Sequence, residues 1–116
     1  MINKELLRKV LGYTNDCRII CIEEEYRNIK YDIVSPVNGH YTERINTFEL
    51  IHKCKDWMFF KGYTFEIEWI HDSEPQDKTR CVVRLGKYGT KGVAGSEQEA
   101  IFKACQWVLE NEDKNE

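Results

Sequence analysis

The three histidines are the side chains best suited to acid–base chemistry, and they lie in three separate parts of the chain. Neither His40 nor His52 has a serine or cysteine nucleophile at motif spacing. The stretch 71–74 (His-Asp-Ser-Glu) brings an imidazole close to two carboxyl groups, the residue types that general acid–base catalysis uses. We expect this stretch to be a solvated hairpin loop, with proton transfer as the alternative, so the sequence predicts no catalytic residue.

The cysteines are the remaining candidates for metal or thiol chemistry. On a strand, Cys17 and Cys21 would lie about 13 Å apart at roughly 3.3 Å per residue, too far to chelate one ion. On a helix, His52 and Cys54 would point about 200° apart. We therefore expect no metal site and no cofactor. Cys54 and Cys105 occupy apolar positions typical of a core, where a thiol acts as a small hydrophobic group.

A glycine-rich stretch, LGKYGTKGVAG, covers residues 85–95. Its glycines recur at every third residue and match neither of the common phosphate-binding patterns. Lys87 and Lys91 could contact a phosphate there. We favour the alternative, in which the glycines form turns and the lysines protect an edge strand from further pairing.

Composition and charge narrow the class of protein. The chain of 116 residues is 41% hydrophobic and 32% charged, as in a globular domain, and no run approaches the length of a membrane span. Residues 96–116 hold two basic and six acidic groups, and residues 1–95 hold 15 basic and 14 acidic groups, so the C-terminal segment supplies the excess behind the net charge of −3. That distribution does not favour electrostatic binding of nucleic acid. With an odd number of cysteines and no recognisable signal peptide, we expect a reduced cytoplasmic protein.

The first 45 residues predict a helix followed by three strands. Asn3 can cap a helix that continues to Leu11, and Gly12 ends it. The run at 17–23 is apolar on both faces, as expected of a central strand. A half-buried strand at 29–34 and a strand at 40–45 follow, joined by a turn containing Asn-Gly.

The rest of the chain predicts a helix, three strands and a closing helix. Asn46 or Thr47 caps the first helix and Gly62 ends it; its apolar stripe comprises Phe48, Leu50, Ile51, Cys54, Trp57 and Met58. Alternation at 64–70, with Phe65, Ile67 and Trp69 facing the core, predicts a hairpin with 80–85 in which Glu66 lies opposite Arg84. A short edge strand near 91–94 and a capping box at Ser96–Glu99 precede the last helix.

This order, αβββ-αβββα, predicts the α+β class, with antiparallel sheets and helices packed on one face. We expect an N-terminal αβββ unit at 1–45 and an αβββα unit at 46–110, both within one compact domain. Residues 111–116 are too polar to pack and form a tail.

Two segments carry a resemblance to a known family. FELIHKCKDWMFFKGY and SEQEAIFKACQWVLE, within residues 46–110, resemble small uncharacterised bacterial proteins of prophage type, with the helix–strands–helix fold called a phage ABA sandwich. The resemblance implies a fold and a phage-like, bacterial origin. It implies no activity, because the matching positions mostly mark packing.

The same residues also follow the element order of a double-stranded-RNA-binding domain. That resemblance would imply lysines at the start of the last helix, where the family contacts phosphates. Here those positions are Glu97, Gln98 and Glu99, which suit a helix N-terminus but repel phosphate. We therefore expect the similarity to be one of topology.

The sequence thus predicts a non-catalytic protein-binding or modulator module whose partner is a protein, and neither nucleic acid nor a membrane. Phe59 lies in line with the outward residues of its helix, and an exposed aromatic side chain is typical of interfaces. The alternative is burial of the Phe59 and Phe60 rings under the N-terminal αβββ unit. The candidate binding residues are Phe59, Phe60, Glu97, Glu99 and Glu110. The alternative is a nucleic-acid-binding accessory factor that uses Arg80, Arg84, Lys87 and Lys91, which requires these four groups on one face.

Overall fold

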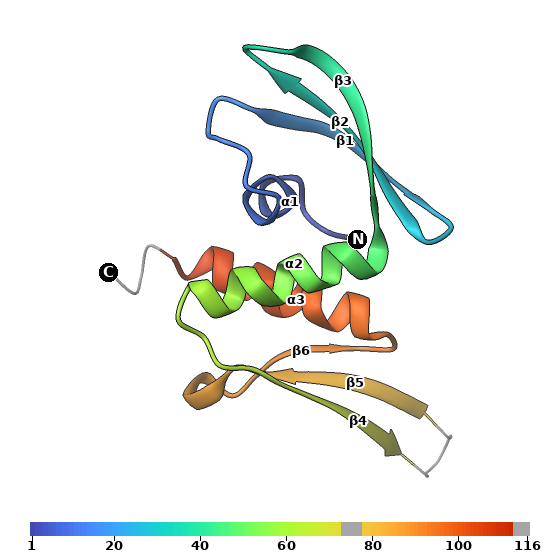
Figure 1. Ribbon diagram of the computed structural model, residues 1–116. Coiled ribbons are helices and arrows are strands. Elements are labelled where there is room, and N and C mark those ends of the chain that lie inside the picture. The colour runs from blue at the N-terminus through green and yellow to red at the C-terminus, as the bar shows by residue number, and fades with distance from the viewer. Residues whose placement is uncertain (73–77, 113–116) are drawn as a thin grey trace. The chain divides into compact units, whose positions relative to one another are not determined.

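The computed structural model describes residues 1–72 and 78–112 (Figure 1). Over these residues it contains three α-helices and two three-stranded antiparallel sheets, which confirms the predicted α+β class and element order. No helix within the described ranges is long and apolar enough to cross a membrane. The elements are α1 (Lys4–Val10), β1 (Arg18–Glu25), β2 (Asn28–Ser35), β3 (Gly39–Asn46), α2 (Thr47–Phe60), β4 (Glu66–Asp72), β5 (Lys78–Arg84), the 3₁₀ turn η1 (Gly86–Tyr88), β6 (Thr90–Ala94) and α3 (Glu97–Glu110).

The chain divides into two compact units, Met1–Cys54 and Lys55–Glu116, here called unit 1 and unit 2. The division falls within α2, whereas the sequence places it between residues 45 and 46, at the end of β3. Each unit contains one of the two sheets and is described by itself.

Unit 1 is built on a sheet with the strand order β1-β2-β3. Along β2 every second residue is buried, and Ile29, Tyr31 and Ile33 form its buried face, as the alternation predicts. α1 begins at Asn3, whose side-chain oxygen accepts hydrogen bonds from the backbone N–H groups of Glu5 and Leu6. Gly39 has a φ of 71°, which agrees with the predicted Asn-Gly turn between β2 and β3.

The prediction of a central strand at 17–23 is wrong, because β1 lies at an edge of the sheet and β2 at its centre. Of the β1 residues only Ile19 is buried, while Ile20 and Cys21 are exposed. Apolar residues on both faces had indicated burial on both sides. The sheet buries one face only, as the alternate burial along β2 shows, and the register of β1 shifts between Ile19 and Cys21.

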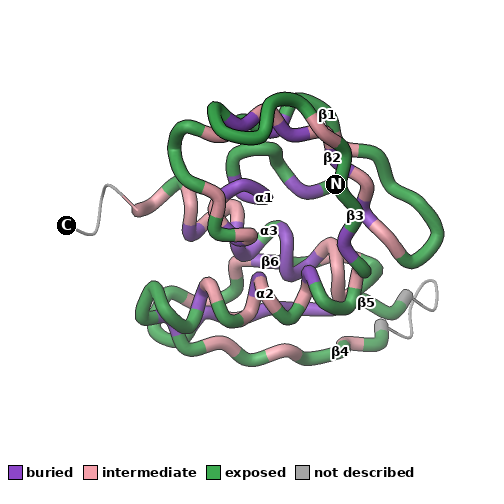
Figure 2. The backbone as a smooth tube through the Cα atoms, turned by 45° about the horizontal axis from the view of Figure 1, so that its top comes forward, coloured by how far each residue is buried: buried purple, intermediate pink, exposed green. Residues whose placement is uncertain are grey.

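Unit 2 is built on a sheet with the strand order β4-β5-β6. Its central strand β5 is buried at Cys81, Val82 and Val83, and Figure 2 shows this burial along the strand. The predicted hairpin register is confirmed, with Glu66 opposite Arg84. α3 begins at Ser96, whose hydroxyl oxygen accepts the Glu99 N–H, as expected of the first half of a capping box.

Two apolar side chains predicted to be buried are exposed instead. Trp69 is 52% exposed because β4 is an edge strand that pairs with β5 alone. Phe48 is 74% exposed in the first turn of α2, while Leu50, Cys54 and Met58 of the predicted stripe are fully buried. The buried stripe of α2 is therefore narrower than its apolar sequence suggests.

Candidate functional site

The predicted aromatic pair is exposed at the C-terminal end of α2. Phe59 is 65% exposed and Phe60 is 83% exposed, so neither ring belongs to the core. Their centroids lie 5.9 Å apart in an edge-to-face arrangement, and Gly62, with a φ of 91°, ends the helix directly after them. Consecutive helix positions differ by about 100°, so the two rings cover adjacent sides of this helix end.

The predicted acidic residues do not form one surface. Glu97 is half-buried and pairs with Lys55, with the Lys55 Nζ 3.1 Å from the carboxylate. Glu110 is exposed at the other end of α3, where it accepts a hydrogen bond from Gln106. A rise of about 1.5 Å per residue separates the first and last turns by close to 20 Å. Glu99 lies in the first turn and is half-buried. The structure brings Glu97 and Glu99 to one end of the helix and leaves Glu110 at the other.

The four basic residues of the alternative prediction divide into two pairs. Arg80 and Arg84 alternate along β5 with the buried Cys81 and Val83, so they lie on the opposite face of the sheet. Arg84 also pairs with Glu68 on the neighbouring strand. Lys87 and Lys91 have different neighbours, described next.

Lys87 and Lys91 lie over a cluster of aromatic rings that the sequence did not indicate. Tyr63, Tyr88 and Trp107 contact one another, with centroid distances of 5.4 Å (Tyr63–Tyr88), 5.4 Å (Tyr88–Trp107) and 6.0 Å (Tyr63–Trp107). The Lys87 Nζ is 5.3 Å from the Tyr88 centroid, and the Lys91 Nζ is 4.6 Å from the Trp107 centroid. Both are cation–π distances. The closeness of Lys87, Tyr88 and Lys91 in the sequence was the available signal, but the position of Trp107 depends on tertiary packing.

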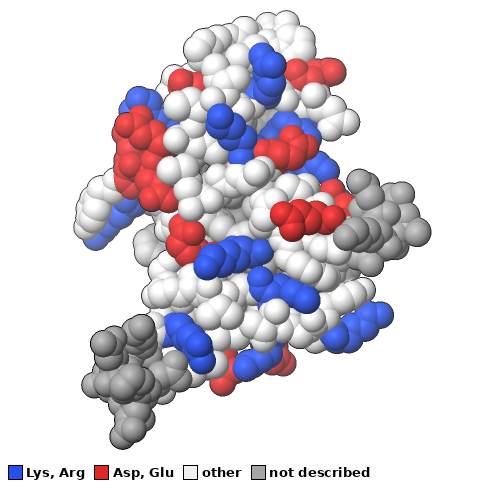
Figure 3. Space-filling model, turned by 180° about the vertical axis from the view of Figure 1, so that it is seen from behind, with Lys and Arg blue, Asp and Glu red and all other residues white. Residues whose placement is uncertain are grey.

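Several basic side chains of unit 2 are paired with acidic ones: Lys55 with Glu97, Lys61 with Glu112 and Arg84 with Glu68. Figure 3, seen from behind, shows Lys and Arg side chains interspersed with Asp and Glu side chains. One of the basic residues of this unit, Lys103, donates from its Nζ to the Val93 carbonyl oxygen of the edge strand β6, at 3.0 Å. Unit 2 holds nine basic and twelve acidic residues, a net charge of −3, so Lys87 and Lys91 form a local positive group in a unit that is acidic as a whole.

Unit 1 contains a cavity of about 760 Å³ beside α1. Its lining is mainly polar and combines basic Lys4, Arg8 and Arg18 with acidic Glu5 and Asp16. The remaining lining residues are Asn3, Asn15, Cys17, Ile19 and Val34. Opposite charges within one lining offset each other, so the cavity shows no clear preference for an anion or a cation.

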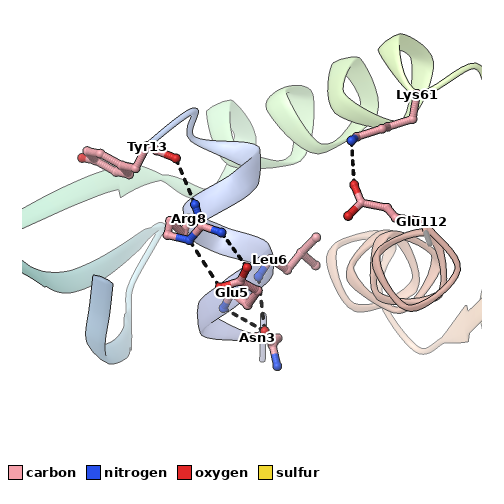
Figure 4. A network of polar contacts seen from close by, with 7 residues as sticks. All are labelled: Asn3, Glu5, Leu6, Arg8, Tyr13, Lys61 and Glu112. Atoms are coloured by element: carbon pink, nitrogen blue, oxygen red, sulfur yellow. Dashed lines mark hydrogen bonds and ion pairs between the residues drawn. The ribbon is translucent and has the colours of Figure 1, made fainter. Parts of the chain in front are cut away.

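Arg8 is the most buried charge of that lining, and its partners are already present (Figure 4). It donates from Nη2 to Glu5 Oε1 at 2.5 Å, from Nε to Glu5 Oε2 at 3.3 Å, and from Nη1 to the Tyr13 carbonyl oxygen at 3.2 Å. The Glu5 carboxylate raises the pKa of Arg8, against the opposing effect of burial. These hydrogen bonds of the Arg8 guanidinium connect α1 to the following loop and stabilise both. They leave the guanidinium poorly suited to bind a ligand. The same view shows the Lys61–Glu112 ion pair of unit 2, at 2.6 Å.

The candidate acid–base stretch lies only partly in the described residues. His71 is exposed on β4, and its Nδ1 is 3.0 Å from the Thr79 hydroxyl. Residues 73 and 74 fall outside the described ranges, so the predicted loop is not tested there. Within those ranges no group of three His, Cys, Asp or Glu side chains could hold a metal ion.

The cysteines are free thiols in two environments. Cys54, Cys81 and Cys105 are buried, as predicted for Cys54 and Cys105, while Cys17 is half-buried and Cys21 exposed. Burial raises the pKa of the Cys81 thiol and disfavours the reactive thiolate.

The chain matches no protein-family model, no curated protein and no solved structure. The resemblances to prophage-type proteins and to double-stranded-RNA-binding domains therefore stay predictions from the sequence pattern. What is established about the site is its geometry: an exposed phenylalanine pair at the end of α2, and an aromatic cluster covered by two lysines.

Proposed function

We propose that this chain is a non-catalytic protein-binding module that docks a partner protein on the Phe59–Phe60 pair. The observation that carries the proposal is the exposure of two consecutive phenylalanines in contact with each other. Aromatic side chains are enriched in the centres of protein interfaces, where they bury large apolar areas.

The position of the pair supports this function. Both rings belong to the last turn of α2, just before Gly62, so a helix holds their backbone in place and little order has to be gained on binding. Glu110 is exposed and adds a negative charge to the surface of unit 2. Such a charge influences the association rate and the choice of partner more than the affinity.

The resemblance to prophage-type proteins suggests that the partner is a bacterial cytoplasmic protein whose activity the chain modulates. The test is capture of partners from a bacterial lysate by the tagged chain, with and without nuclease. A stoichiometric protein that is retained after nuclease treatment is then purified, and its affinity for the chain is measured.

The double variant Phe59→Ala/Phe60→Ala should weaken that affinity by at least tenfold, because truncating a central aromatic anchor typically costs about 2 kcal/mol or more. Phe48→Ala is a matched control, since it removes an exposed phenylalanine from the other end of the same helix. We expect the control to bind within twofold of the wild type. Equal weakening by both variants, or loss of the captured protein with nuclease, contradicts the proposal.

Folding of each variant is checked by urea unfolding. Both truncated rings are exposed, so we expect the midpoint to change little. A large fall in the midpoint for the double variant would show that at least one of its two rings supports the core.

A further inference from the structure

We propose that Lys87, Tyr88, Lys91 and Trp107 form a binding surface for single-stranded nucleic acid. This aromatic–lysine surface lies in unit 2 and shares no residue with the Phe59–Phe60 pair, so the inference goes beyond the protein-binding function proposed above. It rests on the interleaving of aromatic rings with ammonium groups, which is the composition of stacking platforms for single strands.

The rings are held in place by the fold. Tyr63, which follows α2, is 8% exposed and lies beneath the other two rings in the cluster. Tyr88 belongs to η1 and Trp107 to α3, so two elements and the loop after α2 fix the arrangement. Tyr88 remains 38% exposed and Trp107 is half-buried, which leaves ring surface that a ligand can reach.

The two ammonium groups lie over the ring faces on which bases would stack. Lys87 covers the Tyr88 ring, and Lys91 covers the Trp107 ring. An exposed cation–π contact contributes about 0.5 to 1 kcal/mol, whereas a base stacked on an aromatic ring contributes roughly 1 to 3 kcal/mol. A base can therefore displace an ammonium from its ring, and the displaced ammonium can pair with the phosphate of the same nucleotide.

The size and composition of this surface favour a single strand over a duplex. Lys103 lies one helical turn before Trp107 on α3 and extends the positive charge toward β6. Glu110, on the other side of Trp107 along α3, limits the surface in that direction. The aromatic–lysine surface offers a short basic stretch with two accessible rings, which suits a few unstacked nucleotides, because the bases of a duplex are stacked on one another and present no free face.

The first test measures binding of a fluorescently labelled (dT)₁₅ oligonucleotide by anisotropy at several salt concentrations. Lys87→Ala/Lys91→Ala should lower the slope of log K against log salt by roughly 1.4 in magnitude, since each phosphate contact on a single strand contributes about 0.7. Lys4→Ala/Lys53→Ala, which removes the same charge outside the surface, should leave the slope unchanged.

The second test separates stacking from charge. Tyr88→Ala should weaken binding roughly 5-fold to 150-fold, which corresponds to the loss of one stacked base. Tyr88→Phe, which keeps the ring, should bind like the wild type. Phe59→Ala/Phe60→Ala should leave oligonucleotide binding unchanged, so failure of this proposal is distinguishable from failure of the proposed protein-binding function.

Four outcomes would overturn the inference. They are the absence of binding at low salt, equal weakening by the two double-lysine variants, retention of full affinity by Tyr88→Ala, and equal competition by poly-glutamate. The last outcome would assign the surface to an acidic protein segment instead.

Discussion

Tyr31 shows how one buried residue couples the stability of unit 1 to pH. It is 5% exposed, and its hydroxyl lies 2.9 Å from the hydroxyl of Tyr13. Burial and this hydrogen bond raise the pKa of Tyr31 well above its ordinary value of 10.0. The neutral phenol is therefore favoured in the folded state, whereas the unfolded chain loses its proton near pH 10.

We expect Tyr31 to destabilise the fold at high pH. The stability contributed by the neutral phenol of Tyr31 is fully present below about pH 10. It is lost as the pH rises further, because the unfolded state then binds fewer protons than the folded state. One such group lowers the free energy of unfolding by up to about 1.4 kcal/mol per pH unit. Urea unfolding at several values between pH 8 and pH 11 should show this fall in the wild type and a smaller fall in Tyr31→Phe.

The control is Tyr26→Phe, which removes the hydroxyl of a tyrosine that is 83% exposed. If Tyr31→Phe and Tyr26→Phe showed the same pH dependence, the role assigned to Tyr31 would be wrong. At neutral pH, Tyr31→Phe should also cost about 0.5 to 1.5 kcal/mol, since the hydrogen bond to Tyr13 is lost.

At the scale of the elements, features that depend on neighbouring residues were predicted from the sequence, whereas features that depend on the pairing of distant segments were not. The caps at Asn3 and Ser96 and the Asn-Gly turn identified helix starts and a hairpin from a few neighbouring residues. The strand order depends on which distant segments pair, so the apolar run at 17–23 indicated a strand but not its place at the edge.

The same distinction applies to the candidate sites. The outward direction of Phe59 on its helix was predictable from 3.6-residue periodicity, whereas the exposure of the ring was left open because it depends on what the rest of the chain covers. The contact of Tyr63 and Tyr88 with Trp107 was not predictable, because the three residues belong to segments that only the folded sheet and α3 bring together.

Packing of α3 on β6 depends on Gly92. A Cβ atom at this position would lie 2.0 Å from the carbonyl oxygen of Ala100 and 3.2 Å from the backbone nitrogen of Ala104. Because both are backbone atoms of α3, the helix itself would have to move. We expect Gly92→Ala to lower the free energy of unfolding by about 2 to 3 kcal/mol, the upper part of the range for overpacking.

Gly95→Ala is the matched control, since no atom lies within 4 Å of the Cβ that it would introduce. Urea unfolding should place this variant within about 0.5 kcal/mol of the wild type, as for an ordinary surface substitution. Equal stability of Gly92→Ala and Gly95→Ala would contradict the close packing of β6 on α3.

At the scale of the whole molecule, the central strand of each sheet is where backbone amides should be best protected from hydrogen exchange. β2 is central in unit 1 and β5 is central in unit 2, and each carries the buried face of its sheet. A central strand is hydrogen-bonded on both sides, whereas an edge strand exposes one row of backbone groups to solvent or to another chain. The slowest amide exchange should therefore occur in two separate parts of the sequence.

Hydrogen exchange followed by mass spectrometry tests this expectation. Amides in Asn28–Ser35 and Lys78–Arg84 should exchange at least tenfold more slowly than those in Arg18–Glu25 and Glu66–Asp72, because local opening exposes edge strands first. Equal protection of an edge strand would mean that another chain pairs with it. Repeating the exchange at tenfold lower protein concentration distinguishes pairing with a second copy from protection within one chain. Protection supplied by a second copy decreases on dilution, while protection within one chain does not.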